Sequence, residues 1–239
     1  MARRLFYVDE ITGRSAYLRG ETAQHLRKVL RAERGQKYEV SDGDSLWLAE
    51  IEDFGKDLVE FRLLEAIEAA VPSVRVHLYA ALIKFDHFEW ILEKATELGV
   101  ERITPVYSSR VEKGLDQAAL KRGERWRRIL LESGQQARRL SPPALDEPVK
   151  LSAALAAESP LRLWLEEQRG AAPILEALPS PLLEAALLCG PEGGWDDRER
   201  AEAAAAGWTA VSLGPQVLRA ETAALAALSI LSAWAAKPA

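Results

Sequence analysis

Two short loops near the C-terminal end of the chain carry residue types that suit a ligand site. The first loop, residues 189–194, reads CGPEGG, and the second, residues 213–222, reads LGPQVLRAET. Each follows an apolar run at the point where a buried strand is expected to end and a helix to begin. In open α/β sheets ligands bind beyond the carboxyl ends of the strands, and glycines there let backbone amides approach a ligand closely. The two loops together predict one shared ligand cleft.

Several other kinds of chemistry are not indicated. The chain contains no G-x-G-x-x-G after a strand and no Gly-Lys-Ser/Thr, which argues against a dinucleotide site and a P-loop. No serine-centred nucleophile elbow is present. The three histidines and one cysteine lack the spacing of metal ligands, so we predict no metal.

The predicted strands and helices around the loops alternate as they do in proteins with a parallel sheet. Asp196 is expected to cap a helix in a capping box with Glu199, and Gly207 is expected to end that helix. A strand over 209–213 follows at once. Strand, loop, helix and strand in this order predict an α/β fold with a mostly parallel sheet and helices on both faces.

The first 70 residues have a different character. Strands are expected over 4–8, 38–41, 46–51 and 58–64, with a short helix over 22–30, and Asp42-Gly43 is a strong hairpin signal. This pattern predicts a small β-barrel domain over residues 1–70. After a linker at 68–73, strands and helices alternate from Val74, which predicts a second domain over 74–239. In that domain Trp126 and Leu130 are expected on the inner side of a helix whose other side is basic.

The last helix, expected over 223–236, is apolar on every side except for two serines. A helix without a polar face is normally buried all round. We therefore expect burial on every side, with a subunit interface supplying part of it.

Composition and charge limit the class of protein. With 48% hydrophobic and 28% charged residues, the chain has the composition of a globular protein. It has no run long enough to span a membrane and no signal-peptide core, and a single cysteine fits a reducing compartment, so we expect a cytoplasmic location. The net charge is −5, yet residues 1–40 hold nine Lys/Arg against five acids, and residues 110–139 hold nine against four. Two basic stretches in an acidic protein suggest a polyanion partner.

Several motifs together resemble a known family. The stretch Leu188 to Gly194, followed by Leu213-Gly214 and by Val217-Leu218-Arg219-x-Glu221-Thr222-Ala223, is similar to the SPOUT class of RNA methyltransferases. More narrowly, it resembles the bacterial 16S ribosomal RNA (uracil-N3)-methyltransferase family. Supporting stretches read HLRKVLR at 25–31, SDG at 41–43, KATELGV at 94–100 and ITP at 103–105. One departure is Gly134-Gln135, where the family usually has Glu-Gln.

The resemblance implies a fold, a cofactor and partners. It implies a PUA-like β-barrel domain followed by a trefoil-knotted α/β domain, with S-adenosyl-L-methionine bound in the knot. It implies a homodimer formed through the knotted domain and a substrate that is 16S ribosomal RNA or the small ribosomal subunit. The reaction would be methylation of N3 of a uridine.

The same resemblance assigns roles to individual residues. Catalytic roles fall to Arg219, which would stabilise the uracil oxygens as the ring becomes anionic, and to Glu221, which would accept the N3 proton or orient Arg219. Their simpler alternatives are a phosphate contact for Arg219 and a helix cap for Glu221. The expected cofactor-binding residues are Leu165, Glu166, Cys189, Gly190, Pro191, Glu192, Gly193, Gly194, Ser212, Leu213, Gly214, Val217, Leu218, Arg219, Thr222 and Ala223. The expected RNA-binding residues are Arg3, Arg4, Arg27, Lys28, Arg31, Arg110 and Arg138.

Two alternatives stay open at the level of sequence. A ribose 2′-O-methyltransferase of the same superfamily is one, although such relatives typically carry a Ser-Leu-Asn element where this chain has Arg219 to Thr222. The other is a non-catalytic RNA-binding assembly factor, which would bind rRNA without affinity for S-adenosylmethionine.

Overall fold

The computed structural model describes residues 4–111, 114–168 and 170–237. The chain divides into two compact units, one made of Met1–Val71 with Leu131–Pro142 and the other of Pro72–Leu130 with Pro143–Ala239. The sequence pattern placed residues 131–142 with the second domain, whereas in the structure this segment packs with the first unit. Hydroxyl groups hold it there: Tyr7 Oη donates to the carbonyl of Arg139 at 3.0 Å, and Ser41 Oγ donates to that of Leu140 at 2.6 Å.

The first unit is built on a six-stranded sheet in the order β1-β4-β5-β6-β3-β2. Its pairs are antiparallel except for β1 with β4. Apolar side chains such as Phe6, Val40 and Phe61 form its buried core. The elements are β1 (Leu5–Tyr7), β2 (Glu10–Thr12), β3 (Ser15–Arg19), α1 (Gly20–Lys28), β4 (Lys37–Ser41), β5 (Leu46–Phe54) and β6 (Leu58–Ile67).

The predicted hairpin in this unit is confirmed. Strands β4 and β5 pair antiparallel from Lys37 opposite Glu50 to Ser41 opposite Leu46, with Gly43 at φ +97° in the turn between them. Asp42 accepts hydrogen bonds from the backbone of Asp44 and Ser45, which closes the turn. Strands β2 and β3 had no distinct sequence signal and were not expected.

The second unit is built on an all-parallel sheet in the order β10-β8-β7-β13-β11-β14-β12, with β9 beside β8. The elements are β7 (Arg75–Ala81), α2 (Phe85–Glu97), β8 (Arg102–Tyr107), α3 (Leu115–Ala119), α4 (Gly123–Gln136), β9 (Ala144–Leu145), β10 (Val149–Lys150), α5 (Leu151–Leu155), β11 (Arg162–Leu165), β12 (Ala172–Pro173), β13 (Glu184–Cys189), α6 (Asp197–Ala205), β14 (Thr209–Ser212) and α7 (Ala220–Ala235). The last six residues of α4 belong to the first unit.

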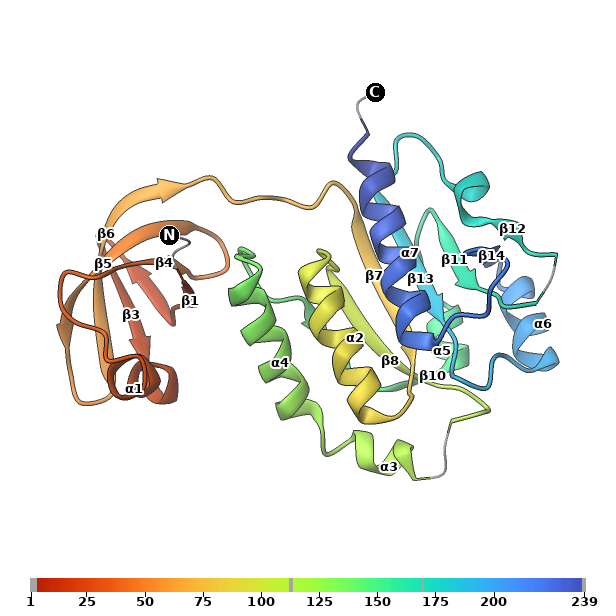
Figure 1. Ribbon diagram of the computed structural model, residues 1–239, viewed down its shortest axis with the longest axis horizontal. Coiled ribbons are helices and arrows are strands. Elements are labelled where there is room, and N and C mark those ends of the chain that lie inside the picture. Colours follow the sequence, from red (N-terminus) through yellow and green to blue (C-terminus); the bar gives the residue numbers. More distant parts are fainter. Residues whose placement is uncertain (1–3, 112–113, 169, 238–239) are drawn as a thin grey trace. The chain divides into compact units, whose positions relative to one another are not determined.

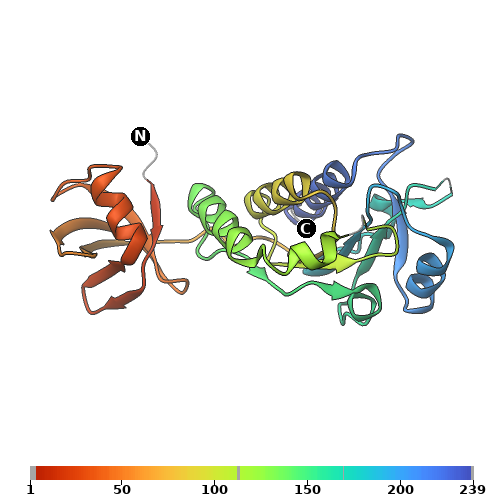
Figure 2. The same cartoon turned by 90° about the horizontal axis from the view of Figure 1, so that it is seen from below.

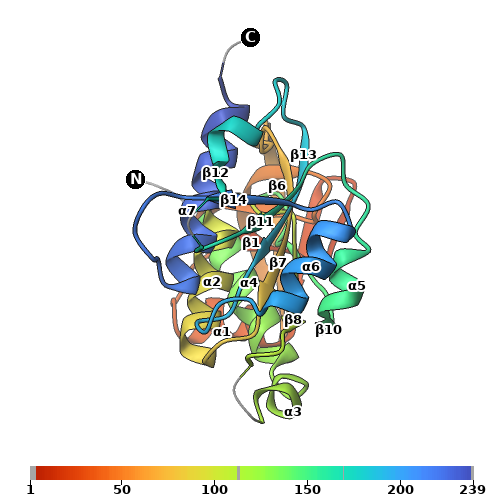
Figure 3. The ribbon, with the colours of Figure 1, turned by 90° about the vertical axis from the view of Figure 1, so that its right-hand side faces the viewer.

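Helices cover both faces of this sheet, as predicted (Figures 1 and 2). Because successive strand residues point to opposite faces, Leu163 and Leu165 enter the core beneath α2 and α7, while Trp164 enters the core beneath α5 and α6. Figure 3 shows these two helix layers on opposite sides of the strands. The predicted inner side of α4 is confirmed too, since Trp126 and Leu130 are both 1% exposed.

The helix signals at α6 were local and are confirmed. The Asp196 side chain accepts from the backbone N–H of Glu199 at 2.8 Å, and Glu199 Oε2 accepts from that of Asp196 at 3.0 Å. Gly207 follows the helix at φ +78°, which is typical of a left-handed C-terminal cap. Glu199 Oε1 also accepts from the backbone of Ser109 at 2.7 Å, a contact with the loop after β8 that no local pattern indicated.

The expectation that the last helix is buried on every side is wrong within one chain. In α7 the side chains of Ala224, Leu228 and Leu231 are buried, but Thr222 and Ser229 are exposed. The reason is that the helix packs on the sheet and on α2 with one side only. Within the described residues, no helix is long and apolar enough to cross a membrane.

Candidate functional site

The ends of three neighbouring strands and the start of the last helix surround a cavity in the second unit. Strands β13, β11 and β14 lie side by side in the sheet, so the loops that follow them meet at one edge. The cavity has a volume of about 260 Å³. It is lined by Leu165, Glu166, Glu167, Gly190, Pro191, Glu192, Gly194, Trp195, Val211, Ser212, Leu213, Gly214, Gln216, Val217, Leu218, Arg219, Ala220 and Ala223.

Most of the residues predicted to bind a cofactor therefore lie around one cavity. Three of them are not part of its lining. Cys189 is buried in the core at the end of β13, where burial raises the pKa of its thiol. Thr222 is exposed on α7, and Gly193 packs against the side chain of Arg110.

Two glycines leave room for neighbouring side chains. A Cβ on Gly190 would lie 2.9 Å from two atoms of the Trp195 indole. Gly194 has φ +67°, and a Cβ there would lie 2.1 Å from Oε1 of Glu167. Glycine at these positions lets the first loop fold back on itself and lets the Glu167 carboxylate lie over the loop backbone.

Trp195 connects the first loop to the neighbouring strand and was missed from the sequence. Its Nε1 donates to the carbonyl of Leu165 at 3.0 Å, and its ring stacks on Trp164 with centroids 5.5 Å apart. Glu167, Val211, Gln216 and Ala220 are further lining residues that were not predicted. Trp195 and Gln216 lie in or beside the two recognised loops, so extending those motifs by a few residues would have found them.

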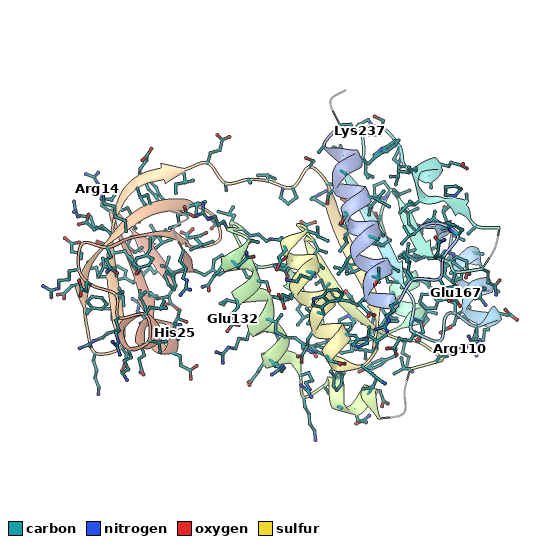
Figure 4. The ribbon with its side chains drawn as sticks, viewed as in Figure 1. Arg14, His25, Arg110, Glu132, Glu167 and Lys237 are labelled. Carbon is teal, nitrogen blue, oxygen red and sulfur yellow. The ribbon has the colours of Figure 1, made fainter. Side chains whose placement is uncertain are left out.

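Carboxylates make the cavity lining acidic. Burial opposes ionisation of Glu166, but hydrogen bonds from Arg200 and from the backbone of Gln168 outweigh it, so its pKa is lowered. Arg200 Nε lies 2.8 Å from Oε2 of Glu166. Glu167 and Glu192 also line the cavity. Figure 4 labels Glu167, which comes from the segment after β11. Such a lining suits a ligand that carries positive charge.

The two predicted catalytic residues point in different directions. Arg219 lines the cavity, is exposed, and forms no ion pair with any described residue. Glu221 is only 5% exposed and is not part of the lining. Its Oε1 lies 3.5 Å from Nδ1 of His87, a residue of α2 that the sequence did not single out. The ion pair with Arg219 that would orient the guanidinium is not formed in the described structure.

The basic residues predicted to bind RNA are mostly on the surface of the first unit. Arg4, Arg27, Lys28, Arg31 and Arg138 are exposed, and Arg3 lies outside the described residues. Two of them, Arg31 and Arg138, have positive φ angles of 49° and 55°.

Arg110 is the predicted RNA-binding residue of the second unit. It is exposed, and its guanidinium donates a hydrogen bond to the carbonyl of Gly193 (Figure 4). It therefore lies against the first glycine loop. Within the described ranges, no group of three or more His, Cys, Asp or Glu side chains is placed to hold a metal ion.

Comparison with known families decides the class of protein. The family model for an RNA methyltransferase domain matches residues 71–232, and that for an RNA methyltransferase PUA domain matches residues 18–64. The chain belongs to the RNA methyltransferase family. The first match covers the whole cavity, and the second lies within the first unit. The predicted fold, an α/β domain preceded by a PUA-like domain, is thereby confirmed.

Individual members of this RNA methyltransferase family align along nearly the full chain. The ribosomal RNA small subunit methyltransferase E of Aquifex aeolicus is 31% identical, over 95% of this chain and 98% of its own length. The protein of the same name from Synechocystis is 34% identical, over 98% of this chain and 78% of its own.

Solved structures agree in fold. A methyltransferase from Legionella pneumophila in complex with S-adenosylmethionine has a TM-score of 0.88 and 31% identity, covering 98% of both chains. A ribosomal RNA small subunit methyltransferase E from Neisseria gonorrhoeae, also bound to S-adenosylmethionine, has a TM-score of 0.88 and 27% identity, covering 97% of this chain and 98% of its own.

Proposed function

We propose that this protein uses S-adenosyl-L-methionine to methylate N3 of a uridine in 16S ribosomal RNA of the small subunit. The observation that carries the proposal is the cavity at the ends of β11, β13 and β14, with Arg219 at its edge and in no ion pair with a described residue. Relatives aligned over nearly the whole chain are named small subunit rRNA methyltransferases, and two similar structures contain S-adenosylmethionine.

The residues around the cavity fit this cofactor. Leu165, Leu213 and Leu218 offer apolar walls for an adenine ring. Gly190 and Gly194 let the backbone of the first loop lie close to Trp195 and Glu167, which also line the cavity. Glu166, Glu167 and Glu192 supply negative charge, which favours a ligand with a sulfonium and an ammonium group. When bound, the cofactor supplies the methyl group from its sulfonium.

The surroundings of Arg219 support its proposed catalytic role. It combines exposure at the cavity with freedom from ion pairs among the described residues. In the proposed reaction its guanidinium binds the uracil oxygens and stabilises the negative charge that develops as N3 loses its proton. Glu221 faces His87 instead of the cavity, so its proposed role is exerted through that histidine.

The exposed basic residues of the first unit are proposed to contact phosphates of the RNA. Arg4, Arg27, Lys28, Arg31 and Arg138 would form this contact surface, and Arg110 would contribute from the second unit. Each phosphate neutralised by a cation releases counterions, so binding should weaken steeply as salt is added.

We further propose that the protein works as a homodimer through its second unit. Along α7, Leu225, Ala226 and Ile230 are only partly buried, and Ala233 is exposed, which leaves an apolar strip beside Thr222 and Ser229. Small residues at such a strip allow two helices to approach closely. The trefoil knot expected from the family resemblance also stays a prediction. It is compatible with β14 lying on the far side of β11 from β13.

Methylation assays test the function directly. Purified small subunits and naked 16S rRNA should be incubated with the protein and labelled S-adenosylmethionine, and the modified nucleoside mapped by mass spectrometry. We expect 3-methyluridine. A methyl group on ribose would instead assign the chain to the 2′-O-methyltransferases, and rRNA binding without measurable cofactor affinity would identify an assembly factor.

A further inference from the structure

A histidine lies between carboxylates beside the cavity. Nδ1 of His87 is 3.5 Å from Oε1 of Glu221 and 3.6 Å from Oε1 of Glu192. On the other edge of the ring, Nε2 is 3.7 Å from Oδ2 of Asp86. These acids come from three elements, namely the first turn of α2, the first glycine loop and the first turn of α7.

The buried part of this cluster has unmet hydrogen-bonding capacity. His87 Nδ1 and Glu221 Oε2 are both buried, and neither has a hydrogen-bond partner among the described residues. A buried polar group without a partner is costly in free energy, so such groups usually serve a purpose. A hydrogen on Nδ1 would give Glu221 a donor after a shift of a few tenths of an ångström. It would also leave the lone pair of the neutral ring on Nε2.

The side chains of this cluster become more exposed from Glu221 through His87 to Asp86. The Glu221 side chain is 6% exposed, the His87 side chain 31% and the Asp86 side chain 76%. A buried carboxylate that orients Nδ1 of an imidazole, with Nε2 toward the open side, is the arrangement by which a histidine becomes a general base.

The ring lies beside residues of the cavity lining, although His87 itself is not part of that lining. Glu192, its second partner at Nδ1, belongs to the cavity lining. Glu221 directly follows Arg219 and Ala220, which line the cavity as well. The start of α7 thus brings together the arginine proposed for the uracil oxygens and the acid that orients His87.

We propose that His87 is the general base that removes the N3 proton, with Glu221 as the positioning residue that holds the ring. This inference rests on the function proposed above. For each methyl group transferred, the N3–H bond breaks and its proton passes to Nε2 of His87. The electron pair left on N3 then bonds the methyl carbon as that carbon leaves the donor sulfur, which keeps its own bonding pair. The imidazolium afterwards loses its proton to solvent past Asp86.

His87→Gln is the most direct variant, because glutamine keeps a donor for Glu221 but cannot take up a proton. In single-turnover assays on small subunits, we expect it to be slower by about 100-fold or more, the usual contribution of a general base. The pH–rate profiles of the wild type and of His87→Gln should differ in shape. His25→Gln is the matched control, because His25 is exposed on α1 in the first unit (Figure 4). It should keep the wild-type rate and pH profile.

Two readouts separate a base from a structural support. Added imidazole should restore about tenfold or more of the rate lost in His87→Ala, whereas a merely structural role would give no rescue. Without any turnover, the nitrogen-15 spectrum of the neutral His87 ring should show the hydrogen on Nδ1, and calorimetry should show cofactor affinity within about threefold of wild type in His87→Gln.

A near wild-type rate in His87→Gln, a failure of imidazole rescue or a hydrogen on Nε2 would each overturn the assignment. These outcomes are distinct from failure of the proposed function, which would appear as a wild-type product other than 3-methyluridine.

Discussion

A Cβ on Gly194 would lie 2.1 Å from the Oε1 atom of Glu167. The first glycine loop and the segment after β11 therefore approach each other so closely that the carboxylate of one fills the side-chain space of the other. At φ +67° the backbone of Gly194 is also in a region that favours glycine.

We expect Gly194→Ala to weaken S-adenosylmethionine binding by about tenfold or more, because the Glu167 carboxylate must leave its position over the loop. Gly13→Ala is the matched control for backbone strain, since Gly13 has φ +62° but open space around it. Both variants should lose about 1 kcal/mol of unfolding free energy, but only Gly194→Ala should change the affinity measured by calorimetry. Equal affinity in both variants would refute the role given to this contact.

Trp195→Phe should destabilise the second unit. The substitution removes the Nε1 donor from the buried carbonyl of Leu165 and reduces the stacking on Trp164. Leaving that carbonyl unpaired should lower the free energy of unfolding by about 1–3 kcal/mol, measured by urea titration. Trp90→Phe, at a side chain that is 46% exposed on α2, should change it by less than about 0.5 kcal/mol.

Arg219→Lys should reduce the methylation rate while leaving the cavity in place. Lysine keeps the charge but lacks the planar fork that can face both uracil oxygens. Loss of the guanidinium donors should slow methylation by about 100-fold or more. Single-turnover kinetics with saturating cofactor would measure this rate. Arg198→Ala is the control, because this exposed residue of α6 does not line the cavity and forms a salt bridge with Glu202 on the same helix. Undiminished turnover in Arg219→Lys would remove the guanidinium from the mechanism.

Acid should destabilise the protein through His77. Burial lowers the pKa of this histidine to about 4 from its ordinary 6.5, because a charged ring is poorly solvated there, although Asp146 opposes the shift. The ring stacks on Tyr79 and its Nε2 lies 2.7 Å from Thr104 Oγ1. Below pH 6.5 the unfolded chain takes up a proton that the folded chain does not, so stability falls as the pH drops from about 6.5 toward 4.

Because the His77 ring keeps some contact with solvent, the free energy of unfolding should fall by only ~1–2 kcal/mol between pH 6.5 and pH 4.5. Urea titrations of wild type and His77→Gln at pH 7.5 and 4.5 would measure it. Because other groups titrate over this range, the difference between the two proteins is the relevant quantity. An identical pH dependence in the two would show that His77 has an ordinary pKa.

Arg31→Gly should weaken RNA binding and leave the fold no less stable. Arg31 has φ +49°, where glycine is favoured by about 1 kcal/mol, so the protein should gain rather than lose thermal stability. Loss of one phosphate contact should lower affinity for 16S rRNA and reduce the slope of its salt dependence by about one. Arg14→Ala, at an exposed arginine outside the proposed contact set, should bind normally. An unchanged slope in Arg31→Gly would exclude a phosphate contact at this position.

Features that depend on neighbouring residues could be predicted from the amino-acid sequence. The capping box of Asp196 with Glu199, the glycine end of α6 and the turn at Asp42-Gly43 depend on atoms a few residues apart, and all three were predictable. Apolar periodicity likewise placed most strands and helices of the second unit. The two glycine loops stood out because glycine is costly except where a turn or a close approach requires it.

Which of these parts meet depends on long-range packing. The sheet order places β13, β11 and β14 side by side, and this order depends on pairing between distant segments that no local pattern encodes. It brings Glu167 over Gly194 and Trp195 to the carbonyl of Leu165. Packing of α2 against α7 likewise places His87 beside Glu221, 134 positions away along the chain. The role of a single histidine cannot be predicted from the sequence, because its chemistry depends on the charged groups that folding brings close to it.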